Sequence, residues 1–255
     1  MLISRDPSGL ADLAPGVPAE NLRRGDFTDP TTLPSAFAGV DELLIISTDA
    51  VGSRLEPQRA AVAAARDAGV RRVVYTSVPG PEDDNPAGVV ADHAATEAAI
   101  RESGLAWTFL RNNLYADMQR PSLDQAAASG SFVTNIGDGR TAYVSRADCA
   151  AVAAAVLATD GHDGQAYDVT GPEAVGADDL AALAGRISGS DVAVVQVDDA
   201  AYVAGLEQAG LPTPVAQLLA SFGTSTREGW LEDVTSVVED LTGRAPQTLA
   251  EAVGL

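Results

Sequence analysis

The order of hydrophobic and polar positions predicts buried strands that alternate with amphipathic helices from residue 41 onwards. Continuous apolar runs at residues 41–48, 72–77 and 106–111 are typical of parallel strands that are buried on both faces. Between these runs, residues 56–68 and 92–103 show helical patterns that are each followed by a glycine stop signal. Strands and helices at this spacing predict a parallel sheet with right-handed crossover connections.

The first 40 residues begin in the middle of such a pattern. Met1 to Ser4 have the character of the end of a strand, and the leucines at positions 10 and 13 follow with helical spacing. A weaker strand is expected at residues 21–27, together with a short helix at residues 34–37. The chain therefore reads as if it enters a βαβ unit partway through.

The pattern loses its regularity after Tyr115. The elements expected there are a turn, a small-residue helix and two short strands, at residues 137–139, 149–158, 165–169 and 192–197 respectively. The rest of the chain from residue 178 is expected to be mostly helical. We expect a Rossmann-like α/β core in residues 1–135 and a smaller, mainly helical substrate-side region in residues 136–255.

Composition and charge narrow the classes of function. The 255 residues are 46% hydrophobic and carry a formal net charge of −20. Such an excess of acid repels polyanions, which argues against nucleic acid and anionic membranes as partners. The single cysteine, Cys149, allows no internal disulfide, and the N-terminus has no apolar signal-peptide core. We therefore expect a cytoplasmic protein. No cluster of His and Cys residues has metal-ligand spacing, so we expect no metal site.

Polar residues end three successive predicted strands, namely Ser47-Thr48, Thr76-Ser77 and Arg111-Asn112. Ligands of open parallel sheets bind outside the carboxyl ends of the strands. Each pair alone is equally well explained by helix capping or by exposure to solvent. Three such pairs on one edge favour a ligand crevice, although the spacing does not identify the ligand.

Six stretches of the sequence carry a family resemblance. They are DHAATE at residues 92–97, GLAWTFLRNNLY at 104–115, GDGR at 137–140, SRAD at 145–148, YDVTG at 167–171 and LTGRAPQTL at 241–249. Together they resemble the NmrA-like branch of the atypical short-chain dehydrogenases, and within it the NAD(P)H:quinone oxidoreductase type. The resemblance covers essentially the whole chain from Ser4. It implies a Rossmann-like fold, NADP or NAD as cofactor, and hydride transfer to a quinone or enone-like small molecule.

The beginning of the sequence departs from the family pattern. In the family, a strand, a Gly-rich turn of GxxGxxG type and a helix precede the segment that matches residues 5–7. Gly9 and Gly16 do not replace that turn, because no strand precedes them and their spacing differs. We expect a sheet without its first strand. In that case the remaining strands pair anew, the N-terminal residues are disordered, or a partner chain supplies the missing strand. A truncated start would explain the departure equally well.

The resemblance implies a set of cofactor contacts. Arg5 would pair with the adenosine 2′-phosphate of NADP, and Asp26 would meet the edge of the adenine. The ribose and the nicotinamide would be lined by Ser47, Thr48, Thr76 and Ser77. Each of these two roles has an alternative. Arg5 would instead form a surface ion pair with Asp6, and Asp26 would be an acidic residue of a turn without a ligand contact.

The candidate catalytic residues are His93, Asn112 and Tyr115. Classical short-chain dehydrogenases carry a Tyr and a Lys where this chain has His93 and Glu97, four residues apart on one helix face. An imidazole can donate or relay a proton near neutral pH, with Glu97 orienting it; an exposed helical pair is the alternative. The amide of Asn112 can bind a carbonyl or a nicotinamide carboxamide, and Tyr115 would cap the pocket.

Three functions remain open from the sequence. The first is an NAD(P)H-dependent oxidoreductase, and the second is a cofactor-independent relative that catalyses an isomerisation or a cyclisation. The third is a non-catalytic protein that senses dinucleotides. The expected partner is a small-molecule substrate, and a homodimer also stays open.

Overall fold

The computed structural model describes residues 1–255, which fold into two compact units. Unit 1 comprises Met1–Thr76, Ala94–Phe109 and Gly161–Gln165, and unit 2 comprises Ser77–His93, Leu110–Asp160 and Ala166–Leu255. Each unit is therefore assembled from three separate segments of the chain. The predicted division into residues 1–135 and 136–255 stays a prediction.

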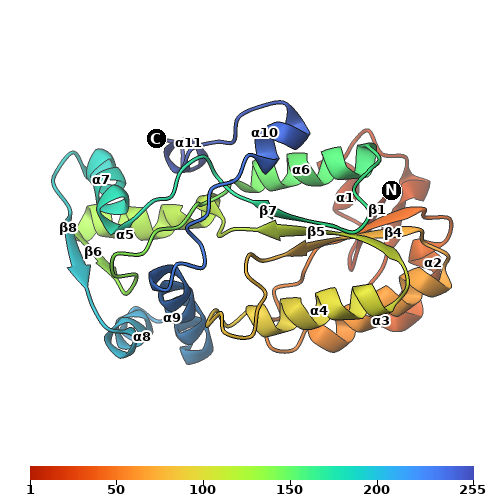
Figure 1. Ribbon diagram of the computed structural model, residues 1–255, viewed down its shortest axis with the longest axis horizontal. Helices are drawn as coiled ribbons and strands as arrows, with labels where there is room; N and C mark the ends of the chain where they lie inside the picture. The colour runs from red at the N-terminus through yellow and green to blue at the C-terminus, as the bar shows by residue number, and fades with distance from the viewer. The chain divides into compact units, whose positions relative to one another are not determined.

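The main sheet has four strands in the order β3-β4-β5-β7 (Figure 1). The strands are β3 (Glu42–Ile45), β4 (Arg72–Ser77), β5 (Ala106–Asn112) and β7 (Gln165–Val169). β3 and β4 pair in parallel, and every residue of β4 is buried, as a parallel strand covered on both faces requires. The sequence prediction of an α/β fold with a parallel sheet is confirmed.

Two further strands form a small sheet of their own in unit 1. β1 (Leu2–Ser4) and β2 (Leu22–Arg24) pair in parallel and only with each other. Arg23 of β2 donates hydrogen bonds to three main-chain carbonyls at the end of α2 (Leu33–Phe37), the shortest at 2.7 Å. These carbonyls lack partners within the helix, so the guanidinium caps it. The predicted absence of a strand from the sheet stays a prediction.

Helix α3 (Leu55–Asp67) supplies a buried face to the core of unit 1, through Ala61, Val62 and Ala65. Helix α4 (Val90–Glu102) follows β4 in the chain, and a four-residue helix, α1 (Leu10–Leu13), follows β1. The apolar core of unit 1 includes Leu33, Phe37, Ile45, Val62, Val73, Tyr75, Ile100 and Phe109. The bounds of α2, α3 and α4 differ from the predicted ones by one or two residues, within the usual uncertainty of helix ends.

Unit 2 contains most of the remaining helices and a second small sheet. The strands of this sheet are β6 (Ser131–Thr134) and β8 (Ala193–Gln196), which pair in parallel. The helices are α5 (Arg120–Ser129), α6 (Arg146–Ala158), α7 (Ala177–Ser188), α8 (Asp199–Gln208), α9 (Thr213–Arg227), α10 (Val237–Thr242) and α11 (Leu249–Ala252). None of the helices in the structure has both the length and the apolar composition that a membrane span requires.

The sequence pattern missed α5 and β6, where it predicted little regular structure. In α5 only Leu123 and Ala126 are buried, so the helix has a narrow apolar stripe and a weak periodic signal. The four residues of β6 pair with β8, far along the chain, and a strand of this length has no local signature.

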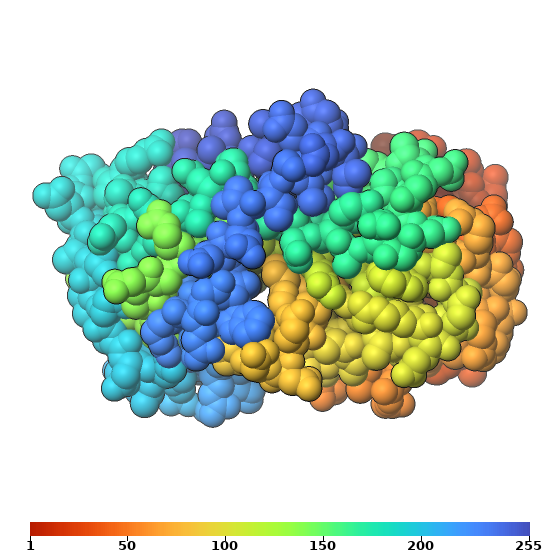
Figure 2. All heavy atoms as spheres, in the orientation of Figure 1, coloured from red at the N-terminus to blue at the C-terminus, as the bar shows by residue number.

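Asp148 anchors the C-terminal segment to α6. Its fully buried carboxylate accepts hydrogen bonds from Ser145 Oγ at 2.7 Å and from the Gln247 backbone N–H at 2.9 Å. Its other oxygen lies 2.6 Å from Nη1 of Arg244. Ser145 in turn accepts from the Asp148 backbone N–H and caps the helix. In Figures 1 and 2 the blue end of the chain accordingly lies over the green α6.

Asp199 joins α8 to α9. Its carboxylate accepts from both Nη atoms of Arg227, at 3.1 and 3.2 Å, and from Nδ2 of Asn135 at 2.7 Å. The Thr224 hydroxyl donates a further hydrogen bond at 3.0 Å. These bonds, that from Arg227 foremost, hold the pKa of Asp199 below its ordinary value.

We expect the contribution of Asp199 to stability to depend on pH. Since the pKa is lower in the folded state, the stabilisation is complete above the unfolded-state pKa of about 3.9 and is lost as pH falls through the folded-state value. Urea unfolding of the wild type and of Asp199→Asn should show a stability difference near neutrality that narrows at acidic pH. A difference that persists unchanged after full protonation would contradict this assignment.

Candidate functional site

The carboxyl ends of β1 and β2 place Arg5 and Asp26 on the same edge of the small sheet. The Gly25 N–H donates to the carbonyl of the last β1 residue at 3.0 Å, which aligns the two strand ends. The Asp26 carboxylate accepts from the Thr28 hydroxyl at 2.7 Å and from its backbone N–H at 2.9 Å. These bonds, with a smaller effect of the Arg5 charge, lower the pKa of Asp26. Arg5 itself is exposed at this edge.

The ends of β3 and β4 bring two hydroxyl groups together in unit 1. The backbone N–H of Ser47 donates to Thr76 Oγ1 at 2.9 Å, and the two side-chain hydroxyls lie 3.2 Å apart. The Thr48 carbonyl accepts from Nη1 of the buried Arg54 at 2.9 Å, which fixes the turn that follows β3. Ser47 and Thr76 therefore present adjacent hydroxyls where an open sheet binds ligands.

Ser77 and Asn112, at the ends of the neighbouring strands β4 and β5, each bury a polar atom that has no partner. Their side chains are 4% and 5% exposed, and neither Ser77 Oγ nor Asn112 Oδ1 has a hydrogen-bond partner. An unpaired buried group of this kind costs about 1–3 kcal/mol. Folds tolerate such a cost mainly where a ligand or an ordered water completes the bonding. These two atoms mark the strand ends in unit 2 as a candidate binding site.

Asn112 lines a small apolar hollow of about 20 Å³ in unit 2. Eight apolar residues and Asn85 form the rest of the wall: Val78, Pro79, Ala87, Val89, Val90, Leu114, Phe222 and Leu231. A hollow of this size holds about one water molecule and lies far below the volume range of ligand pockets. Of the candidate catalytic residues, Asn112 is the one that lines this hollow.

Asn85 holds the loop that forms one wall of the hollow. Its Nδ2 donates to a carbonyl of its own loop at 2.8 Å, while its Oδ1 accepts from the Ala87 N–H at 3.1 Å and from the Ser225 hydroxyl at 2.9 Å. The Gly88 N–H donates to Ser221 Oγ at 2.9 Å. Ser221 and Ser225 both belong to α9, so these bonds tie the loop to the helix that carries Phe222. Sequence reasoning missed Asn85, because the partner that explains it lies far along the chain.

The Asn112 amide makes one hydrogen bond within the protein, to Tyr115, whereas the neighbouring Asn113 amide makes two. Asn112 Nδ2 donates to the Tyr115 hydroxyl at 3.4 Å, and burial raises the pKa of Tyr115, so this hydroxyl stays protonated near neutrality. Both ends of the Asn113 amide are used within the protein, in bonds to the Leu231 carbonyl at 3.0 Å and the Leu114 N–H at 2.7 Å. Asn113 therefore links Leu114 and Leu231, which both line the hollow.

The alternative of an exposed pair formed by His93 and Glu97 is wrong. The two residues are 3% and 1% exposed, and Glu97 Oε2 is bound by Arg101 Nη2 at 2.9 Å. Packing around α4 buries a helix face that the polar residue types led us to expect in solvent. His93 is not among the residues that line the hollow. Its role in proton transfer stays a prediction.

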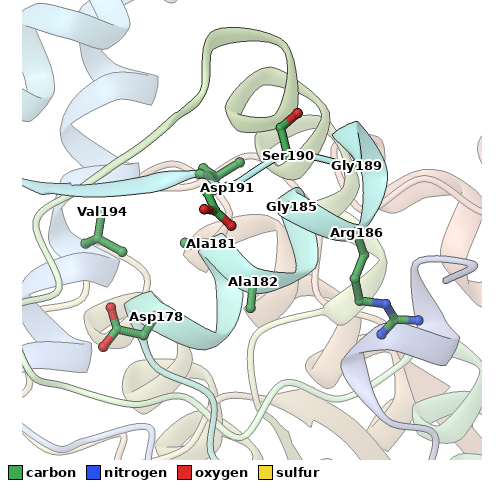
Figure 3. Close-up of a pocket in the computed structure, with 10 residues that line it drawn as sticks. Asp178, Ala181, Ala182, Gly185, Arg186, Gly189, Ser190, Asp191 and Val194 are labelled. Carbon is green, nitrogen blue, oxygen red and sulfur yellow. The ribbon is translucent and has the colours of Figure 1, made fainter.

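Two other features of unit 2 lack the properties of a reaction site. Burial raises the pKa of the Cys149 thiol to about 12, so it is a poor nucleophile. An open groove of about 570 Å³ lies beside α7 and β8, and in Figure 3 Asp178 and Arg186 extend from opposite ends of α7. Its other lining residues are mostly small or exposed, and none of them has a buried atom without a partner.

Comparison with known proteins places this geometry in a family. A family model described as NAD(P)H-binding matches residues 1–160. The chain is 36% identical over 251 residues to quinone oxidoreductase 2 of Escherichia coli (strain K12), covering 98% of this chain and 87% of that protein.

Solved structures agree with the sequence matches. The NADPH-dependent quinone oxidoreductase from Escherichia coli, solved with NADPH, has a TM-score of 0.92 and 36% identity, covering 98% of this chain and 88% of that chain. Triphenylmethane reductase from Citrobacter sp., solved with NADP(H), has a TM-score of 0.89 and 32% identity over the same shares. The transcriptional regulator NmrA, at 18% identity and a TM-score of 0.75, shares the fold. The chain belongs to the NAD(P)H-binding family, in the NmrA-like branch of the atypical short-chain dehydrogenases.

Proposed function

We propose that this protein is an NAD(P)H-dependent oxidoreductase that reduces quinone-like small molecules. The observation that carries the proposal is the pair of buried polar atoms without a partner, Ser77 Oγ and Asn112 Oδ1, at the ends of the neighbouring strands β4 and β5. Membership of the NAD(P)H-binding family supports the cofactor. The names of two similar proteins, a quinone oxidoreductase and a triphenylmethane reductase, support an aromatic substrate.

Residues at the strand ends would hold the dinucleotide. Arg5 and Asp26 would hold the adenosine end, and the hydroxyls of Ser47, Thr76 and Ser77, with Thr48, would line the ribose and the nicotinamide. The unpaired Ser77 Oγ is the observation that favours a ligand with polar groups there. Gly9 and Gly16 are not assigned to the cofactor, because their spacing differs from that of the GxxGxxG turn.

When bound, the reduced cofactor supplies the hydride, and the hydride and a proton together convert a quinone into a hydroquinone with release of oxidised cofactor. The residues of this chain bind and orient the substrate. The apolar residues around Asn112 would exclude water, and the Asn112 amide, which does not titrate, would orient the substrate. The hydroxyl of Tyr115, protonated near neutrality, is the proton-bearing group beside that amide.

The test is turnover by the purified 255-residue protein. We expect oxidation of NADPH, followed by the absorbance of its reduced ring, that depends on added 2-methyl-1,4-naphthoquinone. Calorimetric titration with NADPH and then NADH should show binding without substrate. Binding without oxidation would favour a sensing role, and neither binding nor oxidation would favour cofactor-independent chemistry.

Arg5→Ala should lower kcat/KM with NADPH about tenfold and leave kcat/KM with NADH nearly unchanged. The reason is that the guanidinium would contact only the 2′-phosphate, which NADH lacks. The matched control is Arg24→Ala on the neighbouring strand, where the exposed guanidinium lies 3.8 Å from Asp29. In Arg24→Ala, kcat/KM should stay unchanged with both NADPH and NADH. Equal losses with NADPH and NADH in Arg5→Ala would argue against a contact with the 2′-phosphate.

A further inference from the structure

We propose that Trp230 is a positioning residue of the proposed reaction, because it holds the end of β4 in place relative to the end of β5. The inference rests on the proposed function, which assigns Ser77 to the cofactor and Asn112 to the substrate. Family membership and the names of relatives do not assign a role to Trp230. The role follows from the contacts that join this residue to both strand ends.

The indole ring of Trp230 packs on the main chain of the loop between β4 and α4, which comprises residues 78–89. Its Cε3 atom lies 2.7 Å from the position that a Cβ on Gly80 would occupy. The other two atoms close to that position, Oε2 of Glu82 and Nδ2 of Asn85, belong to the loop itself. Gly80 has a φ of +51°, in the left-handed region that favours glycine. The loop therefore brings bare backbone against the ring shortly after the end of β4.

Hydrogen bonds fix Trp230 and the following Leu231 to α9 and to the end of β5. The Trp230 N–H donates to the carbonyl of Ser225 at 3.1 Å. The Leu231 carbonyl accepts from Nδ2 of Asn113 at 3.0 Å. Because Asn113 directly follows Asn112, the segment that carries the indole ring is bonded next to the substrate side of the site.

The small hollow shows that these three parts of the chain meet. Val78 and Pro79 line it from the loop after β4, Asn112 from the end of β5, and Leu231 from the segment beside the ring. At about 20 Å³ it has room for roughly one water molecule, so the three parts are almost closely packed. Removal of the indole ring leaves space beside Gly80 into which the loop can relax, whereas β5 stays held in the main sheet.

Ser77 and Asn112 would contact different ligands, so their relative position matters for the reaction between those ligands. A shift of the β4 end relative to the β5 end keeps the residues that bind each ligand and changes how the two ligands face each other. A misplacement of about 1 Å can slow a reaction about a hundredfold. We therefore expect the ring of Trp230 to affect the rate of hydride transfer more than the binding of either ligand.

The experiment compares the wild type with Trp230→Ala and Trp230→Phe, with Trp230→Leu in place of the alanine variant should the latter not fold. Stopped-flow single turnovers of NADPH with 2-methyl-1,4-naphthoquinone give the rate constant and the amplitude of NADPH oxidation. A merely structural role would lower the amplitude, because unfolded protein does not react, and would leave the rate constant of the folded fraction unchanged. Calorimetric titration gives the Kd of NADPH. Hydrogen exchange of the ligand-free protein, measured on peptides from residues 78–89, follows the loop directly.

Two controls isolate the contact between the ring and the loop. Trp107→Ala removes the other tryptophan, which stacks on Phe109 in unit 1 with ring centroids 4.3 Å apart. It should lower stability and leave both the rate constant and the exchange of the loop unchanged. Gly80→Ala places a methyl group against the ring, and its combination with Trp230→Ala completes a double-mutant cycle. The double variant should lose less than the product of the two single losses, because the added methyl group no longer meets the ring.

We expect Trp230→Ala to lower the rate constant by about tenfold or more, to change the Kd of NADPH by no more than about twofold, and to speed hydrogen exchange in the loop. Trp230→Phe keeps a ring against Gly80 and should stay near the wild type. An unchanged rate constant or unchanged loop exchange in Trp230→Ala, or equal losses in Trp107→Ala, would overturn the inference and leave the proposed function standing. No turnover by the wild type would overturn both.

Discussion

Replacement of Gly171 by alanine is expected to lower the free energy of unfolding by about 3 kcal/mol, through overpacking that the backbone cannot relieve. A Cβ at this position would lie 2.0 Å from the carbonyl oxygen of Tyr143 and 3.1 Å from its carbonyl carbon. Neither atom can rotate away, because both belong to the main chain. The Gly171 N–H also donates to the Ala142 carbonyl at 3.2 Å, so the two segments are held at this close approach.

Gly205 provides the matched control. It lies within α8, and a Cβ there would meet no atom within 4 Å. Gly205→Ala should therefore raise stability by about 0.5–1 kcal/mol, since alanine has the higher helix propensity. Urea unfolding of both variants measures the contrast. A Gly171→Ala protein as stable as the wild type would show that the two segments can separate without cost.

Asp148→Ala is the second change for which we expect a loss of about 3 kcal/mol. The substitution removes the acceptor of the Gln247 N–H and the Ser145 hydroxyl, and it removes the ion-pair partner of Arg244. The donors at Gln247 and Ser145 are then left unpaired in a site where the aspartate side chain is fully buried. The C-terminal segment should consequently detach from α6 more readily.

Two further variants separate the parts of this contact. Asp148→Asn keeps an acceptor and loses the charge, so its loss should be smaller than that of alanine. Arg244→Ala removes only the outer partner, whose side chain is 46% exposed, and should cost about 1 kcal/mol or less. Limited proteolysis combined with urea unfolding follows both detachment and stability. Equal losses in Asp148→Ala and Arg244→Ala would mean that the ion pair, rather than the buried hydrogen bonds, holds the segment.

The sequence pattern predicted the strands of the main sheet well because their signal is local. Arg72–Ser77, predicted from an apolar run, and Gln165–Val169, predicted as a short strand, have the predicted bounds. The strand predicted at residues 41–48 is shorter in the structure. At its end, the Ser47 N–H donates to the Thr76 side chain rather than to a backbone carbonyl of the neighbouring strand. By contrast, β6 depends on pairing with β8, which no local run of residues reveals.

The candidate site was predictable where a strand end points to it and not where distant segments enclose it. Asn112 follows from its place after a buried run, and the structure puts it in the wall of the hollow. Phe222 comes from α9, and the loop opposite is held through Asn85 and Ser225. Side chains from loops and from a distant helix leave no periodic trace in the sequence, so three-dimensional packing alone identifies them.

The order in which the chain enters the two units limits how recombination can exchange segments between related proteins. The backbone passes between the units after Thr76, His93, Phe109, Asp160 and Gln165, so neither unit corresponds to one stretch of gene. A single crossover within residues 77–165 would leave each unit a mixture of two parents. Transfer of the substrate-side hollow between relatives would require three segments to move together. We expect new specificities in this architecture to arise by point substitution within the wall rather than by shuffling of gene fragments.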